Sequence, residues 1–261
     1  MSEAFLANIL DYKRALIKEK RDFYFSLKWK VKKCARPHLF RDMLAGPGQI
    51  KLIAEVKKAS PSRGLIREDF DPVSIAKIYA ENNATAISVV TEDKYFLGKP
   101  EFVKQISKAV NIPILAKDFI IDEGQIHEAL ANGANAVLLI VAILDDVQLK
   151  GLIDRARSLG LDCLVEIHNT NELKRACAAG AEIIGVNNRD LHAFVVDMQT
   201  CKRLIPKVPE GKIIVGESGF KKYSEVKALK NIGAHGVLIG ETFMREQDIG
   251  KKIRKVLYGQ S

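Results

Sequence analysis

Residues 53–62 have the sequence Ile-Ala-Glu-Val-Lys-Lys-Ala-Ser-Pro-Ser, an apolar, strand-like run that contains two opposite charges. Side chains alternate between the two faces of a strand, so Glu55 and Lys57 share one face while Ala54 and Val56 share the other. Pro61 and its neighbours end the strand in a loop. A carboxylate and an ammonium at the end of a buried strand are costly unless they pair with each other or with a ligand. This stretch is therefore the first indication of an active site.

Apolar runs like this one recur through the rest of the chain. The eight predicted strands are Leu52–Val56, Ala86–Val90, Ile112–Ala116, Ala136–Val141, Cys163–Ile167, Ile183–Val186, Ile213–Val215 and Val237–Ile239. Most intervals between them have a helical pattern, at Val73–Glu81, Pro100–Ala109, Gly124–Ala131, Val147–Leu159, Asn171–Ala179, Met198–Leu204 and Ser224–Ile232. Strands that alternate with helices indicate βαβ units and a parallel sheet.

Three of the predicted helices end at a glycine that is followed by alanine and then by the next strand: Gly133, Gly180 and Gly233. Glycine readily adopts the left-handed conformation that ends a helix. Eight repeats in about 210 residues match the usual size of a (β/α)₈ TIM barrel, which is the predicted α/β fold. A doubly wound open sheet is the alternative, but no G-x-G-x-x-G motif follows the first strand.

The segment before the first repeat is expected to be helical. Charged residues separate an apolar pattern of Ile9, Tyr12, Leu16 and Phe23, and Gly46-Pro47-Gly48 ends the segment. We therefore expect two parts: an N-terminal helical extension (1–47) packed on the barrel, and a (β/α)₈ catalytic domain (48–261).

The composition is that of an ordinary globular protein with a basic surface. The chain has 41 Lys and Arg against 32 Asp and Glu, a net charge of +9. That charge fits an anionic small substrate, nucleic acid or a solvated surface. The lysines are scattered, apart from a basic region at Lys18–Lys33, so a nucleic-acid partner is only weakly supported.

The cysteines and the N-terminal sequence indicate the cellular compartment in which the protein is expected. Cys34, Cys163, Cys177 and Cys201 lack a C-x-x-C or zinc spacing, which favours free thiols in a reducing compartment. We find no signal-peptide pattern and no apolar run long enough to cross a bilayer. A cytoplasmic protein without a membrane partner is expected.

Polar side chains follow most of the predicted strands at their carboxyl ends, where TIM barrels have their active sites. In chain order they are Glu55, Lys57, Ser60, Lys117, Asp118, Glu166, Asn187, Arg189, Glu217 and Ser218. A lysine ammonium can act as a general acid, and a nearby glutamate can accept and return a proton. A structural ion pair is the better interpretation of any one of these residues. Their convergence on one mouth favours catalysis.

Other residues near the same strand ends suit a planar, anionic substrate. Phe96 and Phe119 would form an apolar wall, with ordinary packing as the alternative, and Arg189 suits anion binding. Gly219 and Gly240 follow the last two strands, where barrels often bind phosphate through loop N–H groups. The histidines are dispersed, without metal-binding spacing, and only His168 lies near a strand end. No metal or cofactor is expected.

The motifs at these positions resemble those of the indole-3-glycerol phosphate synthase family of tryptophan biosynthesis. The matching elements are I-A-E-V-K-K-A-S-P-S (53–62), D-F-D-P (69–72), A-I-S-V-V-T-E-D-K-Y-F-L-G (86–98), A-K-D-F-I-I-D (116–122), V-L-L-I-V-A (137–142), L-V-E-I-H (164–168), I-G-V-N-N-R-D-L (184–191), G-E-S-G (216–219) and L-I-G-E-T-F-M-R (238–245). They extend over the chain from about residue 50. The N-terminal helical segment resembles the extension of that family.

The resemblance implies a carboxy-lyase that acts on 1-(2-carboxyphenylamino)-1-deoxyribulose 5-phosphate. The substrate is ring-closed, decarboxylated and dehydrated without a cofactor. Lys117 would be the general acid and Glu166 its acid/base counterpart, and Glu55 and Lys57 would complete the catalytic set.

The resemblance also implies contacts with the rest of the substrate. Asn187 and Ser218 would hold hydroxyls or the aromatic carboxylate. The anionic ends would lie near Ser60, Gly219, Gly240 and Glu241, and the aromatic ring near Phe96 and Phe119.

Three positions depart from the family pattern. Glu241 stands where a serine is expected in the last loop, and a carboxylate aimed at a phosphate would repel it. We therefore expect the Glu241 side chain to turn away. Gly216 replaces a serine before Glu217, and Ala116 replaces an arginine before Lys117.

Two other functions remain open from the sequence. One is a phosphate-binding barrel that isomerises a phosphoribosyl amine, which needs one acid/base pair and leaves Lys57 without a task. The other is a basic barrel that binds nucleic acid or a protein without catalysis, which the interspersed acidic residues argue against. A monomer or a homodimer is compatible with either.

Overall fold

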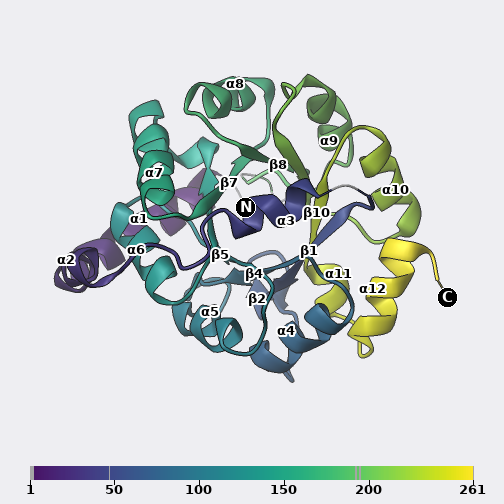
Figure 1. Cartoon of the computed structure of the whole chain (residues 1–261), viewed down its shortest axis with the longest axis horizontal. Coiled ribbons are helices and arrows are strands. Elements are labelled where there is room, and N and C mark those ends of the chain that lie inside the picture. Colours follow the sequence, from purple (N-terminus) through teal and green to yellow (C-terminus); the bar gives the residue numbers. More distant parts are fainter. Residues whose placement is uncertain (1–2, 47, 192, 194, 261) are drawn as a thin grey trace.

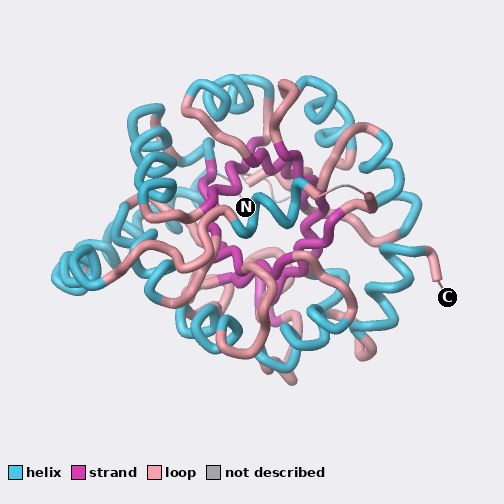
Figure 2. The backbone as a smooth tube through the Cα atoms, viewed as in Figure 1, coloured by secondary structure: helices cyan, strands magenta, loops and turns pink. Residues whose placement is uncertain are grey.

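A computed structural model describes residues 3–46, 48–191, 193 and 195–260. Within this part of the chain, eight parallel strands close into a barrel in the order β1-β10-β9-β8-β7-β6-β5-β4, surrounded by helices (Figures 1 and 2). The strands are β1 (Lys51–Val56), β4 (Ala86–Val90), β5 (Ile114–Lys117), β6 (Ala136–Ile140), β7 (Asp162–Ile167), β8 (Ile183–Asn187), β9 (Ile213–Glu217) and β10 (Gly236–Ile239). The predicted TIM barrel is confirmed. An open sheet is excluded because the first and last barrel strands pair, from Lys51 with Gly236 to Ala54 with Ile239.

Two strand ends differ from the sequence prediction by two residues, and the other differences are of one residue. Strand β5 begins at Ile114 rather than Ile112, because Pro113 has no N–H group to donate to a ladder. Strand β9 continues two residues past the expected end, and Glu217 pairs with Asn187 of β8. Glu217 is therefore a strand residue whose side-chain direction is set by the barrel.

Each barrel strand is followed by a helix on the outside. The main outer helices are α4 (Pro72–Glu81), α5 (Pro100–Ser107), α6 (Glu123–Ala131), α7 (Asp146–Ser158), α8 (Thr170–Ala178), α9 (Gln199–Leu204), α10 (Tyr223–Asn231) and α12 (Ile249–Tyr258). Shorter elements are β2 (Ala59–Ser60), β3 (Gly64–Leu65), η1 (Val141–Ile143), η2 (Ile205–Lys207) and α11 (Glu241–Met244). Gly133, Gly180 and Gly233 have φ values of 90°, 86° and 101°, so the predicted left-handed helix ends are confirmed.

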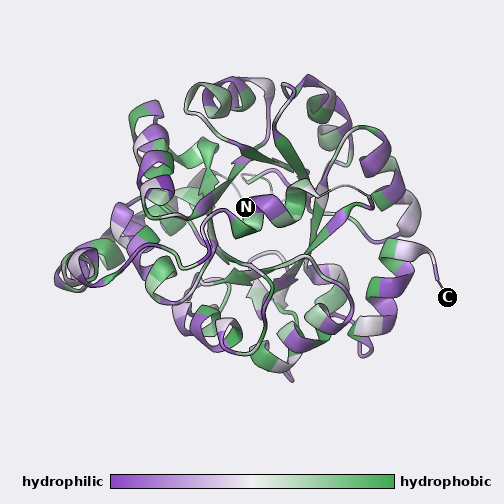
Figure 3. Ribbon diagram, in the orientation of Figure 1, coloured by the Kyte–Doolittle hydropathy of each residue, from purple (hydrophilic) through white to green (hydrophobic). Residues whose placement is uncertain are grey.

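The strands are apolar on both faces, as strands covered on both sides must be (Figure 3). Leu115 and Leu164 belong to a cluster inside the barrel. Ala116 and Val165, one residue further along the same strands, belong to the cluster shared with the outer helices. This alternation fixes which side chains enter the barrel mouth.

The N-terminal segment forms α1 (Glu3–Glu19), α2 (Arg21–Lys30) and α3 (Leu39–Ala45) in its described part. The connection over residues 31–38 is not helical, contrary to the expectation of helix throughout. Pro37 disfavours helix at the residue before it, which fits the later part of this connection. Phe23 is also 46% exposed, while Tyr24 and Leu27 are buried instead. The boundary between residues 47 and 48 stays a prediction, because Pro47 lies outside the described residues.

The extension contacts both ends of the barrel. Helix α3 covers the amino-terminal end of the strands, where Phe40 and Leu44 are fully buried in the interior cluster (Figure 1). Helix α1 reaches the opposite end, where the buried Lys13 Nζ lies 2.7 Å from Asp118 Oδ1. Asp118 directly follows Lys117, so the extension contacts the loop that begins at a candidate catalytic residue.

Helix α2 lies along α6 on the outside of the barrel. A Cβ atom at Gly124 of α6 would lie 2.5 Å from the Tyr24 ring, so only glycine permits this close packing. None of the helices in the described residues has the length and apolar character required to span a membrane.

Candidate active site

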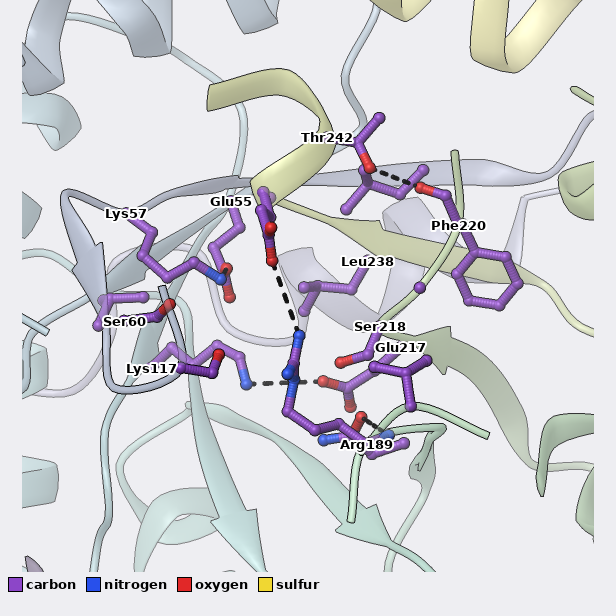
Figure 4. Close-up of a pocket in the computed structure, with 18 of the residues that line it drawn as sticks. Glu55, Lys57, Ser60, Lys117, Arg189, Glu217, Ser218, Phe220, Leu238 and Thr242 are labelled. Carbon is purple, nitrogen blue, oxygen red and sulfur yellow. Dashed lines mark hydrogen bonds and ion pairs between the residues drawn. The ribbon is translucent and has the colours of Figure 1, made fainter. Parts of the chain in front are cut away.

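A cavity of about 890 Å³ opens at the carboxyl ends of the strands. Every candidate residue named from the sequence contributes to its wall: Glu55, Lys57, Ser60, Phe96, Lys117, Phe119, Glu166, Asn187, Arg189, Ser218, Gly219, Gly240 and Glu241. Figure 4 shows the side chains of Lys57, Lys117 and Ser218 directed into this space. The sequence residues therefore come together, and their individual roles stay predictions.

The strand period explains this convergence. Glu55, Lys117 and Glu166 each lie two residues beyond an interior core residue on the same strand, namely Ile53, Leu115 and Leu164. Because side chains alternate, these polar groups must point into the barrel and not toward the helices.

Glu55 and Lys57 form an ion pair across the first loop. Lys57 Nζ lies 2.5 Å from Glu55 Oε1, and both side chains are largely buried. Burial would raise the pKa of Glu55, but the ammonium groups of Lys57 and Lys117 outweigh it and lower that pKa. A Cβ atom at Gly240 would lie 2.3 Å from Glu55 Oε1, so Gly240 makes room for this carboxylate.

Lys117 lies between two carboxylates at the centre of the mouth. Its Nζ atom is 3.6 Å from Glu166 Oε2 and 3.6 Å from Glu217 Oε2. Burial would lower the pKa of Lys117, but Glu166 and Glu217 raise it. Lys117 is therefore an ammonium at neutral pH and can donate a proton.

From the sequence, Glu217 was named among the polar residues that follow the strands, but it was given no role in the site. The predicted strand ended at Val215, which left Glu217 in a loop of unknown direction. The period-two pattern of Ile213 and Val215, both interior, was the available signal, since it places Glu217 inside. A Cβ atom at Gly185 would lie 2.1 Å from Glu217 Oε1, so a glycine on β8 provides the space.

The pKa values of the two carboxyl groups beside Lys117 are shifted in opposite directions. Burial and the negative charge of Glu166 raise the pKa of Glu217. Burial would also raise the pKa of Glu166, but Lys117 and His168 lower it. Two neighbouring carboxylates with pKa values pushed apart provide one ionised acceptor and one group that retains its proton longer.

The aromatic side of the cavity is formed by Phe96 and Phe119. Their ring centroids are 6.1 Å apart at an angle of 45°. Glu92 accepts a hydrogen bond of 2.9 Å from the Phe96 N–H group, and Asp118 accepts one of 2.7 Å from the Phe119 N–H group. Two loops thus hold a tilted pair of rings against the cavity.

Another side of the cavity has the backbone conformation and the cationic side chains expected of an anion-binding site. Ser218 and Gly219 have φ values of 64° and 90°, a left-handed turn that is strained for serine. The buried Ser60 Oγ has no hydrogen-bond partner among the described residues. Arg63, Arg189 and Arg245 complete this side of the cavity.

Glu241 lies among these arginines, and the expectation that it turns away from the cavity is wrong. Its Oε1 atom is 3.1 Å from Arg63 Nε and 3.1 Å from Arg245 Nε. Its Oε2 atom is 3.8 Å from Arg189 Nη2. Ion pairs with cations outweigh the tendency of a lone carboxylate to avoid an anion site.

The donor atoms at the mouth are nitrogen and oxygen groups suited to proton transfer. Among the described residues, no group of three His, Cys, Asp or Glu side chains is arranged to hold a metal ion. His192, one of the five histidines, lies outside the described residues.

Solved structures of proteins with little sequence identity to this chain have the same barrel fold. The chain superposes on 3-hexulose-6-phosphate synthase from Salmonella typhimurium with a TM-score of 0.61 and 18% identity, over 79% of this chain and 96% of that one. A chain from a structure described as the tryptophan synthase complex of Pyrococcus furiosus gives a TM-score of 0.60 and 17% identity, over 80% and 98%. At these identities the likeness shows the fold alone.

Sequence relatives are more specific. The family model described as indole-3-glycerol phosphate synthase matches residues 6–256. The indole-3-glycerol phosphate synthase of Campylobacter jejuni strain 81-176 is 53% identical over 80% of this chain and 81% of its own length. That of Acetivibrio thermocellus is 49% identical over 84% of this chain and 85% of its own length. That of Campylobacter curvus is 46% identical over 92% of this chain and 95% of its own length. By sequence, fold and cavity together, the chain belongs to the indole-3-glycerol phosphate synthase family.

Proposed function

We propose that this chain is a carboxy-lyase of tryptophan biosynthesis that converts 1-(2-carboxyphenylamino)-1-deoxyribulose 5-phosphate into indole-3-glycerol phosphate, carbon dioxide and water. The main support from the geometry is the Lys117 ammonium between Glu166 and Glu217, next to the Glu55–Lys57 pair. The reaction needs several proton transfers at one place, and this cluster contains proton donors and acceptors within a few ångströms of each other.

Ring closure is the first step of the proposal. The aromatic carbon that bears the carboxylate attacks the ketone carbon, and Lys117 donates a proton to the ketone oxygen as the new C–C bond forms. Phe96 and Phe119 hold the aromatic ring on one side of the cavity, which restricts it to an orientation suited to attack. The product of this step is a cyclic carboxylate with a new hydroxyl group.

Decarboxylation and dehydration follow. The bond to the carboxylate breaks, carbon dioxide leaves, and its electron pair restores the aromatic ring. The new hydroxyl then leaves as water after it takes a proton from an ammonium or from the Glu217 carboxyl. Glu166 accepts a proton from the ring carbon next to the nitrogen as the new double bond of the indole forms, and the nitrogen keeps its own proton. Lys57 acts either near the substrate carboxylate or in dehydration.

The remaining cavity residues bind the substrate in this proposal. Asn187 and Ser218 hold hydroxyls or the aromatic carboxylate. The phosphate lies near Arg189, Ser60 and the backbone of Gly219 and Gly240, and Glu241 exchanges contacts with the same cations. The proposal uses no cofactor, and it assumes a cytoplasmic monomer or homodimer without nucleic-acid or membrane partners.

The test is to add the arylamino-deoxyketose phosphate to the purified chain and to follow indole fluorescence and carbon dioxide together. We expect the two products in equal amounts. Turnover of a phosphoribosyl amine to its isomer, with neither indole nor carbon dioxide formed, would instead support the isomerase alternative. A salt-dependent shift with DNA or RNA, without turnover of either compound, would support the binding-protein alternative.

A further inference from the structure

His168 directly follows strand β7 and lies behind the proposed proton acceptor. Its Nε2 atom is 3.2 Å from Glu166 Oε1, and its side chain is 13% exposed. Glu166 belongs to the cavity wall, whereas His168 does not belong to the described residues that form it. His168 therefore contacts Glu166 without itself forming part of the described cavity wall.

The other ring nitrogen of His168 is held by Glu172 at the start of α8. Glu172 Oε2 lies 3.0 Å from His168 Nδ1 and accepts a 2.7 Å hydrogen bond from the His168 backbone N–H group. Asn169 donates from its side-chain amide to Glu172 Oε1 at 2.5 Å and accepts from the Glu172 N–H group at 2.9 Å. Each oxygen of Glu172 is thus fixed by a neighbour, and so is the imidazole ring.

Glu166 has a different cation at each of its oxygens. Oε2 faces Lys117 at 3.6 Å and Oε1 faces His168 at 3.2 Å. Neither oxygen has a hydrogen bond of good geometry within the described residues, so the carboxylate is oriented by charge and remains able to accept a proton. Two cations on opposite oxygens define the plane of the carboxylate.

The charges around the ring favour imidazolium. Burial would lower the pKa of His168, but contacts with Glu166 and Glu172 raise it to about 10. The ring faces Glu166 of β7 and Glu172 of α8, and beyond Glu166 lie Lys117 of β5 and Glu217 of β9. Asn187 of β8, which also contacts Glu166, is neutral.

We propose that His168, fixed by Glu172, is a positioning residue that orients Glu166 and keeps it a carboxylate for the proton-transfer steps. The proposal rests on the proposed function, because Glu166 is the acceptor in that reaction. His168 itself exchanges no proton with substrate. Its effect should therefore be found in the turnover number and its pH dependence, while KM changes little.

The first experiment does not depend on activity. NMR of the imidazole of His168 as a function of pH should show a ring that is still protonated at pH 8 in the native chain. In Glu172→Gln the titration should move to lower pH. A neutral His168 ring at pH 7 in the native chain would overturn the proposal, whatever the chain does with substrate.

The second experiment uses turnover. We expect His168→Gln to lower kcat about tenfold, less than loss of a general base, and to shift the acidic limb of the kcat profile to higher pH. Glu172→Gln should shift it the same way by a smaller amount. In a Glu166→Gln background, His168→Gln should have no further effect. An unchanged acidic limb in folded His168→Gln, or additive losses in the double variant, would contradict the proposal.

His38→Gln is the matched control. His38 also contacts a buried carboxylate, Asp162, at 3.2 Å, but at the opposite end of β7. The control should keep the native pH profile. If the native chain forms no indole, the proposed function fails, and the NMR experiment still reports on His168.

Discussion

At each end of strand β7 a buried carboxylate contacts a histidine, but the two carboxylates have different surroundings. At the amino-terminal end, Asp162 accepts a 2.9 Å hydrogen bond from the Arg41 N–H group, and its other oxygen contacts His38. At the carboxyl end, Glu166 contacts His168 and Lys117 without a hydrogen bond of good geometry in the described residues. Asp162 anchors α3, whereas Glu166 remains available to a ligand.

The residues around the two ends of the barrel differ in the same way as the two carboxylates. The amino-terminal end is closed by Phe40 and Leu44 of α3, which are fully buried. Most buried side-chain atoms without hydrogen-bond partners in the described chain belong to the mouth, including those of Ser60, Glu166 and Glu217. Buried unpaired polar groups cost stability. The unpaired polar groups at the mouth therefore lower the stability of the fold, whereas the apolar closed end raises it. The following predictions test this difference between the two ends.

The largest effect is expected at the mouth. Lys117→Ala should lower turnover by at least about a hundredfold, because it removes the proposed general acid. The measurement is kcat from indole fluorescence. Lys150→Ala, which removes an exposed lysine that pairs with Asp154, is the control and should keep native turnover. Near-native turnover in folded Lys117→Ala would remove Lys117 from the proposed mechanism.

The closed end should show the opposite pattern. Leu44→Ala should lower the free energy of unfolding by about 3 kcal/mol, within the usual range for a buried leucine. Urea denaturation measures this change. Turnover at temperatures well below unfolding should stay close to native. A large loss of kcat in the folded variant would show that the two ends are coupled and would break the comparison.

Glu217 should make stability depend on pH. Its pKa is raised in the folded chain, by burial and by Glu166, so the folded state binds more protons than the unfolded state between the ordinary carboxyl pKa and the raised one. Native stability attributable to Glu217 is present below the ordinary carboxyl pKa and is lost as pH rises through the folded value, by at most about 1.4 kcal/mol per pH unit.

Glu217→Gln cannot ionise and should lack this contribution. Urea denaturation from pH 5 to pH 8 should therefore show a smaller decline in stability for the variant than for the native chain. Parallel stability curves for the two proteins would rule out the raised pKa. Glu225→Gln changes a half-buried carboxylate that caps α10, and this control is expected to keep the native slope.

The smallest effect is expected at Glu241. Glu241→Ser should bind substrate as tightly as the native chain or up to about threefold tighter, because the removed carboxylate occupies Arg63 and Arg189. Calorimetric binding of the substrate to a Lys117→Ala background would measure this without turnover. Markedly weaker binding would show that Glu241 arranges the arginines for the anion.

Much of the site could be predicted because the alternation of side chains along a barrel strand determines which residues face the cavity. Glu55, Lys117 and Glu166 stand at the ends of apolar runs, and strand alternation sends such residues into one cavity. Glu217 was named only as a residue after a strand, and its role was missed, because the end of a short strand is poorly defined by apolarity once Gly216 interrupts it. The direction of Glu241 was predicted wrongly because two of its three arginine partners, Arg63 and Arg189, come from distant segments of the chain.

By itself, the sequence determined the alternation of strands and helices, the glycine helix ends and the polar residues that follow each strand. These depend on neighbours a few residues apart, so they can be recognised along the chain. Only the tertiary structure decided that α1 and α3 contact opposite ends of the barrel, that Glu217 faces Lys117, and that Glu241 joins Arg63 and Arg189. Those contacts join residues far apart in sequence, and their free energy exists only after the barrel has closed.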